Sequence, residues 1–129
     1  MKSENKEFVE KAQKELDTEN FEELINLSDM ELDTNPNNYD AYFFKGMALF
    51  KLEKFNKSIK CFEMAIKINP KNLKSYEMIG MVFNLLNDFK NADKWFSKAL
   101  KINPNDHQLS FCKGLNLLDL NQYNSAIKY

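Results

Sequence analysis

The chain has 129 residues, a length that suits a single domain with its own hydrophobic core. Eighteen lysines and no arginine stand against 19 acidic residues, so the formal net charge is −1. A nucleic-acid-binding protein normally has a basic surplus and arginines that contact phosphates and bases, so this composition argues against a nucleic-acid partner. No run approaches 18 apolar residues and the amino terminus is polar, so we expect a cytoplasmic protein with no membrane partner.

The prolines and glycines of the chain follow one period of 34 residues. They are Pro36, Pro70 and Pro104, and Gly46, Gly80 and Gly114. Since every proline and every glycine obeys this spacing, the chain is built from a 34-residue repeat. The repeats are residues 5–38, 39–72, 73–106 and a partial one at 107–129, which together form one domain over residues 1–129.

Each repeat contains two helical patterns, so we expect seven full helices and one partial helix. In the segments 55–68 and 89–102, apolar residues recur on one helical face. Short polar segments predict the turns between paired helices: LEKF at 52–55, LNDF at 86–89 and LNQY at 120–123.

Helix boundaries are marked by asparagine, aspartate and proline. The predicted amino-terminal capping residues, whose side chains can accept hydrogen bonds from first-turn amides, are Asn38, Asn72 and Asp106. Proline disfavours helical geometry at the residue before it, so the preceding helices should end at Asn35, Asn69 and Asn103.

The glycines fall in the middle of predicted helices, where each costs about 1 kcal/mol relative to alanine. Each precedes a small residue of the next helix by twelve positions, and these residues are Ser58, Ala92 and Ala126. We therefore expect the two helices of each pair to approach closely at these positions.

In this register the repeats resemble the tetratricopeptide repeat (TPR). The shared positions are an early aromatic (Tyr42, Tyr76), the glycine, an aromatic (Phe55, Phe89, Tyr123), a small residue, a further phenylalanine (Phe62, Phe96), an alanine (Ala65, Ala99) and the proline. The resemblance implies an all-α, right-handed superhelical solenoid of antiparallel helix pairs that recognises proteins on its concave side. Lys45 and Lys113 depart from it, because the family usually has leucine there, and the first repeat lacks most of the signature.

Little in the chain could carry catalysis or bind a metal. The single histidine, His107, stands at a helix start, and Cys61 and Cys112 lie in apolar helical contexts typical of buried thiols. Cys112 follows His107 by five residues, which turns the two onto different faces. No HExxH, CxxC or glycine-rich phosphate loop occurs. We therefore expect a non-enzyme with no cofactor and no metal site.

Some TPR co-chaperones bind acidic chaperone tails through a clamp of basic and amide side chains. The aligned positions are Val9, Gln13, Phe44, Lys74 and Met78 or, one repeat later, Phe43, Met47, Met78, Gln108 and Cys112. Only Lys74 fits such a clamp, so this interpretation is disfavoured.

The first helix of each repeat predicts an apolar concave groove instead. The helix at 39–52 is apolar nearly all round and needs burial on two sides. By the resemblance, its second side is a groove for a peptide or helix of a partner protein. The predicted binding residues are Phe43, Phe44, Met47, Phe50, Lys74, Glu77, Met78, Met81, Asn84, Leu85, Phe111, Leu115 and Leu118, with Asp40 and Asp119 as further polar contacts.

An alternative stays open, in which these residues are covered within the protein or by a second copy. The sequence stops at Tyr129, inside the last repeat. A solenoid needs a polar terminal cap, so either the array continues or another chain covers this end. The alternative function is therefore a structural self-association module that forms a homo-oligomer through the groove and the open carboxyl-terminal end.

Overall fold

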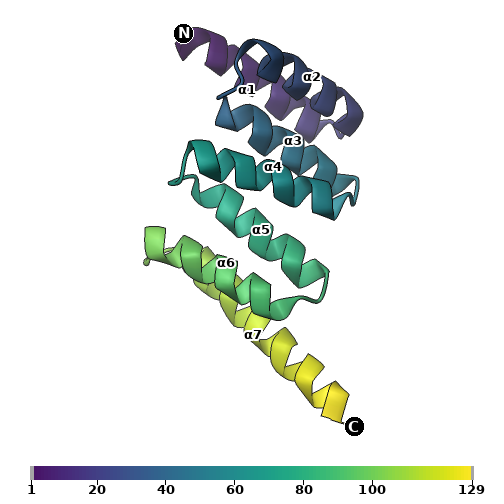
Figure 1. Cartoon of the computed structure of the whole chain (residues 1–129), viewed down its shortest axis with the longest axis vertical. Helices are drawn as coiled ribbons and strands as arrows, with labels where there is room; N and C mark the ends of the chain where they lie inside the picture. Colours follow the sequence, from purple (N-terminus) through teal and green to yellow (C-terminus); the bar gives the residue numbers. More distant parts are fainter. Residues whose placement is uncertain (1, 129) are drawn as a thin grey trace. The chain divides into compact units, whose positions relative to one another are not determined.

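The computed structural model describes the backbone of residues 2–128 and the side chains of residues 5–126. These residues contain seven α-helices and no β-strand, which confirms the predicted all-α repeat fold. The helices are α1 (Lys2–Asp17), α2 (Phe21–Thr34), α3 (Tyr39–Lys51), α4 (Phe55–Ile68), α5 (Leu73–Leu85), α6 (Phe89–Ile102) and α7 (His107–Lys128), as Figure 1 shows.

The chain divides into two compact units. Unit 1 is Met1–Pro70, which carries α1 to α4, and unit 2 is Lys71–Tyr129, which carries α5 to α7. In unit 1, α1 packs on α2 and α3, α2 packs on α3, and α3 pairs with α4. In unit 2, α5 pairs with α6, and α6 packs on α7. Within each unit, consecutive helices are therefore packing partners, as a helical repeat requires.

Each unit has its own core of large rings beside alanines. In unit 1, Phe8, Leu24 and Phe44 are buried with Ala12, Ala41 and Ala48. In unit 2, Phe96 and Leu109 are buried with Ala92 and Ala99. Alanine at these positions lets neighbouring helices approach, and full burial of one phenylalanine contributes about 1.5–3 kcal/mol.

The prolines end the second helices as predicted. Asn35, Asn69 and Asn103 are the carboxyl-terminal caps of α2, α4 and α6, with φ of −130°, −128° and −134°. The backbone N–H of each cap still donates to the carbonyl four residues earlier. The chain therefore leaves the helix at the residue that proline restricts.

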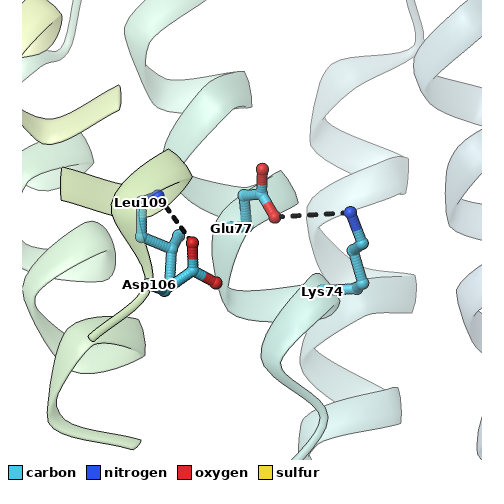
Figure 2. Close-up of polar contacts among 4 residues, drawn as sticks. All are labelled: Lys74, Glu77, Asp106 and Leu109. Atoms are coloured by element: carbon cyan, nitrogen blue, oxygen red, sulfur yellow. Dashed lines mark hydrogen bonds and ion pairs between the residues drawn. The ribbon is translucent and has the colours of Figure 1, made fainter. Parts of the chain in front are cut away.

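Helices α3, α5 and α7 begin directly after the three predicted caps, and two of these caps accept a hydrogen bond through their side chains. The Asn38 side chain accepts from the Asp40 N–H at 3.1 Å, and Asp106 Oδ1 accepts from the Leu109 N–H at 3.0 Å (Figure 2). Asn72 is the amino-terminal cap of α5 as predicted, but its side chain makes no capping hydrogen bond. Its backbone carbonyl accepts from the Ser75 N–H at 3.2 Å instead.

The predicted turns at 52–55 and 86–89 are confirmed, and both use a left-handed residue. Glu53 and Asn87 have φ of 61° and 62°. In each turn the next N–H reaches back five residues, from Lys54 to the Leu49 carbonyl and from Asp88 to the Phe83 carbonyl, both at 2.8 Å. This pattern is the Schellman motif, which satisfies carbonyls that a helix end leaves unpaired.

The third predicted turn, at 120–123, is wrong. Helix α7 runs without a break from His107 to Lys128, so its second half does not fold back as a separate eighth helix (Figure 1). Asn121, which aligns with Glu53 and Asn87, is an ordinary helical residue.

The predicted reason for the glycines is also corrected. A Cβ added to Gly46 would lie 2.8 Å from the Phe62 ring, and one added to Gly80 would lie 2.7 Å from the Phe96 ring. The glycines therefore make room for aromatic rings of the paired helix, and not for Ser58 or Ala92. In the described part of the chain nothing lies within 4 Å of a Cβ added to Gly114, because the expected Ala126 continues along the same helix.

Candidate partner-binding site

Unit 2 contains an apolar cavity of about 220 Å³ between α5 and α7. It is lined by Met81, Asn84 and Leu85 of α5, Phe96 of α6, and Cys112, Leu115 and Asp119 of α7. Four of these residues (Met81, Asn84, Leu85 and Leu115) belong to the predicted binding set, and Asp119 was expected as a polar contact. Phe96 and Cys112 were not among the predicted binding residues.

The mouth of this cavity is formed by leucines that water reaches. Leu85 is 56% exposed and Leu115 is 46% exposed, whereas Phe96 at the base is buried. On α7, Phe111 and Leu118 extend the apolar surface beside Leu115, with exposed fractions of 66% and 58%. Spacings of four and three residues place these three side chains on one side of the helix. Such an exposed apolar stripe is unusual on a protein that acts alone.

A polar network joins the helices at one side of the cavity. Asn84 Nδ2 donates to Asn116 Oδ1 at 2.8 Å and to Asp119 Oδ2 at 3.2 Å. Asn116 Nδ2 donates in turn to the Phe89 carbonyl at 2.8 Å. The network links α5, the start of α6 and α7, and so fixes the walls of the cavity relative to one another.

Asn116 was missed by the sequence analysis. It is 1% exposed and stands where the earlier repeats have Val82 and Ala48, both fully buried. A buried amide costs free energy unless it is hydrogen-bonded, and both Asn116 amide atoms have partners. An asparagine aligned with buried apolar residues was the signal that could have identified it.

A charged cluster lies toward the start of α5 and α7 (Figure 2). Lys74 Nζ lies 3.7 Å from Glu77 Oε2, and the Glu77 side chain is almost fully buried while Lys74 is exposed. The pKa of the Cys112 thiol is raised, first by burial and then by the negative charges of Glu77 and Asp106. This thiol is therefore a weak nucleophile at neutral pH.

The remaining predicted residue of unit 2, Met78, is buried and contributes no exposed surface. In unit 1 the predicted aromatics are largely engaged in packing. Phe44 is 5% exposed and its ring packs edge-on against Phe8. Phe43 is half-buried against Phe44 and Phe62.

The last two predicted residues of unit 1, Met47 and Phe50, are also half-buried. The Phe50 ring packs edge-on against Phe55 of α4. The exposed apolar surface among the predicted residues therefore lies on unit 2.

The two lysines that replace the usual leucine are each paired with an aspartate of the preceding helix. Lys45 Nζ lies 2.8 Å from Asp29 Oδ1, and Lys113 Nζ lies 3.9 Å from Asp93 Oδ1. The hydrogen bond that the Lys45 ammonium donates to the Asp29 carboxylate is the main reason why the pKa of Lys45 is raised. These ion pairs explain how a charged residue is tolerated beside the core.

Groups able to hold a metal ion are absent from the residues that the structure describes. Over the same residues, none of the helices is both long and apolar enough to cross a membrane. Cys61 is a free thiol whose pKa is raised by burial, and His107 is exposed at the start of α7.

Two consecutive stretches of the chain, residues 39–72 and 73–106, each match the tetratricopeptide repeat. Together they make up more than half of the sequence. The chain belongs to the TPR family. The matched ranges coincide with the second and third repeats of the proline and glycine period. A comparison with curated protein sequences finds no significant match.

Solved TPR structures share this fold at low sequence identity. The first TPR of Spaghetti (RPAP3) bound to the HSP90 peptide SRMEEVD is 22% identical, with a TM-score of 0.81, over 88% of this chain and 90% of that one. The Sgt2 TPR domain from Aspergillus fumigatus is 16% identical, with a TM-score of 0.85, over 95% and 82%. The second TPR domain of human RPAP3 with the HSP70 peptide SGPTIEEVD is 16% identical, with a TM-score of 0.77, over 84% and 91%.

Proposed function

We propose that this TPR protein is a non-enzymatic interaction scaffold that binds a peptide or helix of a partner protein on the apolar surface of unit 2. The observation that supports this most directly is the cavity between α5 and α7, with exposed Leu85 and Leu115 at its mouth and Phe111 and Leu118 beside it. Concave apolar surfaces with a few polar groups are the usual form of such sites. The peptide complexes of similar TPR domains support the same role.

The chaperone-tail clamp stays disfavoured. Among the aligned positions, Phe44 lies in the core of unit 1, Met78 is buried, and Val9 packs against the core of unit 1. None of these side chains can donate a hydrogen bond to an acidic tail. The peptides SRMEEVD and SGPTIEEVD both end in the acidic sequence EEVD. Because the aligned side chains of this chain cannot donate hydrogen bonds to such an end, we do not extend the recognition of these peptides to this chain.

The proposal is tested by a double substitution in unit 2, Leu85→Ser with Leu115→Ser. Both side chains are largely exposed in the free chain, so helicity and unfolding should change little, whereas partner binding should fall strongly. The measurement is affinity capture from the source cells with quantitative mass spectrometry. Met30→Ser in unit 1 is the matched control, because Met30 is 68% exposed and far from α5 and α7 in sequence. Unchanged capture by the double variant would refute the proposed site.

The alternative is self-association through the same exposed stripe on α7. Its support is that Phe111, Leu115 and Leu118 form an apolar face on α7. Light scattering across the micromolar range separates the two functions. A concentration-dependent dimer that the Leu118→Ser variant abolishes would favour the homo-oligomer, and a monomer at every concentration would exclude it.

A further inference from the structure

The cavity of unit 2 is lined by a single charged residue. Of its seven lining residues only Asp119 is charged. Within residues 5–126 no lysine forms an ion pair with Asp119, whereas Lys74 pairs with Glu77 and Lys113 pairs with Asp93. Among the described residues, no lysine therefore lies within ion-pair distance of the carboxylate at the mouth of the cavity.

The hydrogen-bond partner of Asp119 is an uncharged residue. The carboxylate receives one hydrogen bond, from the neutral Asn84 amide at 3.2 Å. Along α7, Asp119 is the sole charged residue between Gly114 and Ala126. The α5 residues that line the cavity beside it, Met81, Asn84 and Leu85, are all uncharged. A bound segment would thus meet an apolar cavity followed by a carboxylate.

We infer that the site takes a basic amphipathic helix of a partner protein, which inserts an apolar side chain into the cavity and places a lysine or arginine against Asp119. This inference rests on the proposed function and names the chemistry of its partner. Leu115 and Asp119 lie one helical turn apart on α7. The apolar anchor and the basic residue of the partner are therefore also about one turn apart, at a spacing of three or four residues. An acidic tail would bring like charge to Asp119 and is disfavoured.

The experiment is a selection from a displayed library of helical peptides about five turns long, with the full chain as bait. The Leu85→Ser/Leu115→Ser variant serves as the subtraction bait. We expect the enriched peptides to carry Leu, Met or Phe with Lys or Arg three or four residues away. Enriched peptides with acidic or uncharged residues at that spacing would overturn the inference while leaving the binding function intact. Absence of enrichment over the double variant would overturn both.

Charge substitutions then test the pairing directly by fluorescence anisotropy with one enriched basic peptide. Asp119→Asn keeps an oxygen that can accept from Asn84 and removes the charge, so affinity should fall about three- to tenfold. Asp119→Lys should reverse the preference, so that a charge-reversed peptide with Glu in place of the basic residue binds more tightly than the original. The control is Asp33→Lys, because Asp33 is an exposed carboxylate on α2 of unit 1. Equal affinities for wild type and Asp119→Asn would refute the role of Asp119.

Discussion

The third repeat and the fourth segment of the chain carry similar sequences and fold differently. In the third repeat, LNDF at 86–89 breaks the helix, and α6 folds back on α5. In the fourth, LNQY at 120–123 stays helical inside α7. The left-handed residue Asn87 and the helical residue Asn121 are the same amino acid at the same repeat position. The turn is thus decided by more than its local sequence.

What differs is the burial gained after the turn. A left-handed conformation costs a residue other than glycine about 1–2 kcal/mol. In the third repeat, α6 offsets this cost by burying Phe89, Ala92, Phe96 and Ala99. In the fourth segment, the aligned residues Tyr123 and Ala126 are both exposed. Continuing the helix keeps its backbone hydrogen bonds. The Tyr123 ring can still pack against the Phe89 ring, with the two ring centroids 5.7 Å apart.

The largest expected difference in unfolding free energy is between alanine substitutions of the aligned aromatics Phe89 and Tyr123. Phe89 is 8% exposed and Tyr123 is 47% exposed. Phe89→Ala should lower the free energy of unfolding by about 3–5 kcal/mol, as for other buried phenylalanines. Tyr123→Ala should cost no more than about 1.5 kcal/mol, the scale of one aromatic pair. Urea unfolding followed by circular dichroism measures both, and equal losses would mean that the second half of α7 is buried in solution.

A second contrast uses the same substitution, glycine to alanine, at two positions. The change in the free energy of unfolding should have opposite signs at the two. Gly80→Ala places a methyl group 2.7 Å from the buried Phe96 ring, so it should cost about 1–3 kcal/mol through overpacking. Gly114→Ala meets no neighbour in the described chain and removes a glycine from a helix, so it should gain up to about 1 kcal/mol. Both values come from chemical denaturation. A loss at Gly114 would show that something in solution packs against α7 there.

A third contrast concerns the turn residues themselves. Asn87→Ala replaces an asparagine, which tolerates positive φ better than most residues, by an alanine, which rarely adopts it, so at a φ of 62° it should cost about 1 kcal/mol. Asn121→Ala replaces a helical asparagine by the best helix former and should gain about 0.5 kcal/mol. Amide hydrogen exchange of residues 118–126 provides the local readout. If Asn121→Ala instead made these amides exchange faster, the continuous form of α7 would be refuted.

The parts of the fold that the sequence predicted are those set by local chemistry. Asparagine before proline ends α2, α4 and α6 because proline restricts its neighbour, whatever packs nearby. The course of α7 does not follow from its local pattern, because LNDF forms a turn at 86–89 whereas the aligned LNQY stays helical at 120–123. Asn72 shows the same limit on a small scale, since a favourable residue type at a cap does not fix the rotamer of its side chain.

The candidate site was predicted only in part for a similar reason. Helical periodicity indicates which residues share a face, and so it found Met81, Leu85 and Leu115 together. It does not show whether a neighbour covers that face, which is why Phe44 was grouped with Phe111 although one is buried and the other exposed. Asn116 was missed because its partners, Asn84 and the Phe89 carbonyl, lie 32 and 27 residues away in sequence.

The smallest expected effect tests whether the first half of α7 packs against α5 and α6 within unit 2. Cys112 aligns with the buried Met78 and lines the cavity. Because its pKa is raised, the unfolded chain loses this proton at lower pH than the folded chain does. Stability should therefore fall slightly as pH rises through the unfolded thiol pKa, about 8.5, and stop falling above the folded value.

Alkylation by iodoacetamide in a Cys61→Ser background measures this shift, since the thiolate is the reacting form. The pH of half-maximal rate should be higher for folded Cys112 than for the urea-unfolded chain. Glu77→Gln removes one of the two carboxylates but leaves the thiol buried, so it should lower that pH only part of the way. A folded profile that coincides with the unfolded one would place Cys112 in open solvent, and α7 would then lie away from α5 in solution.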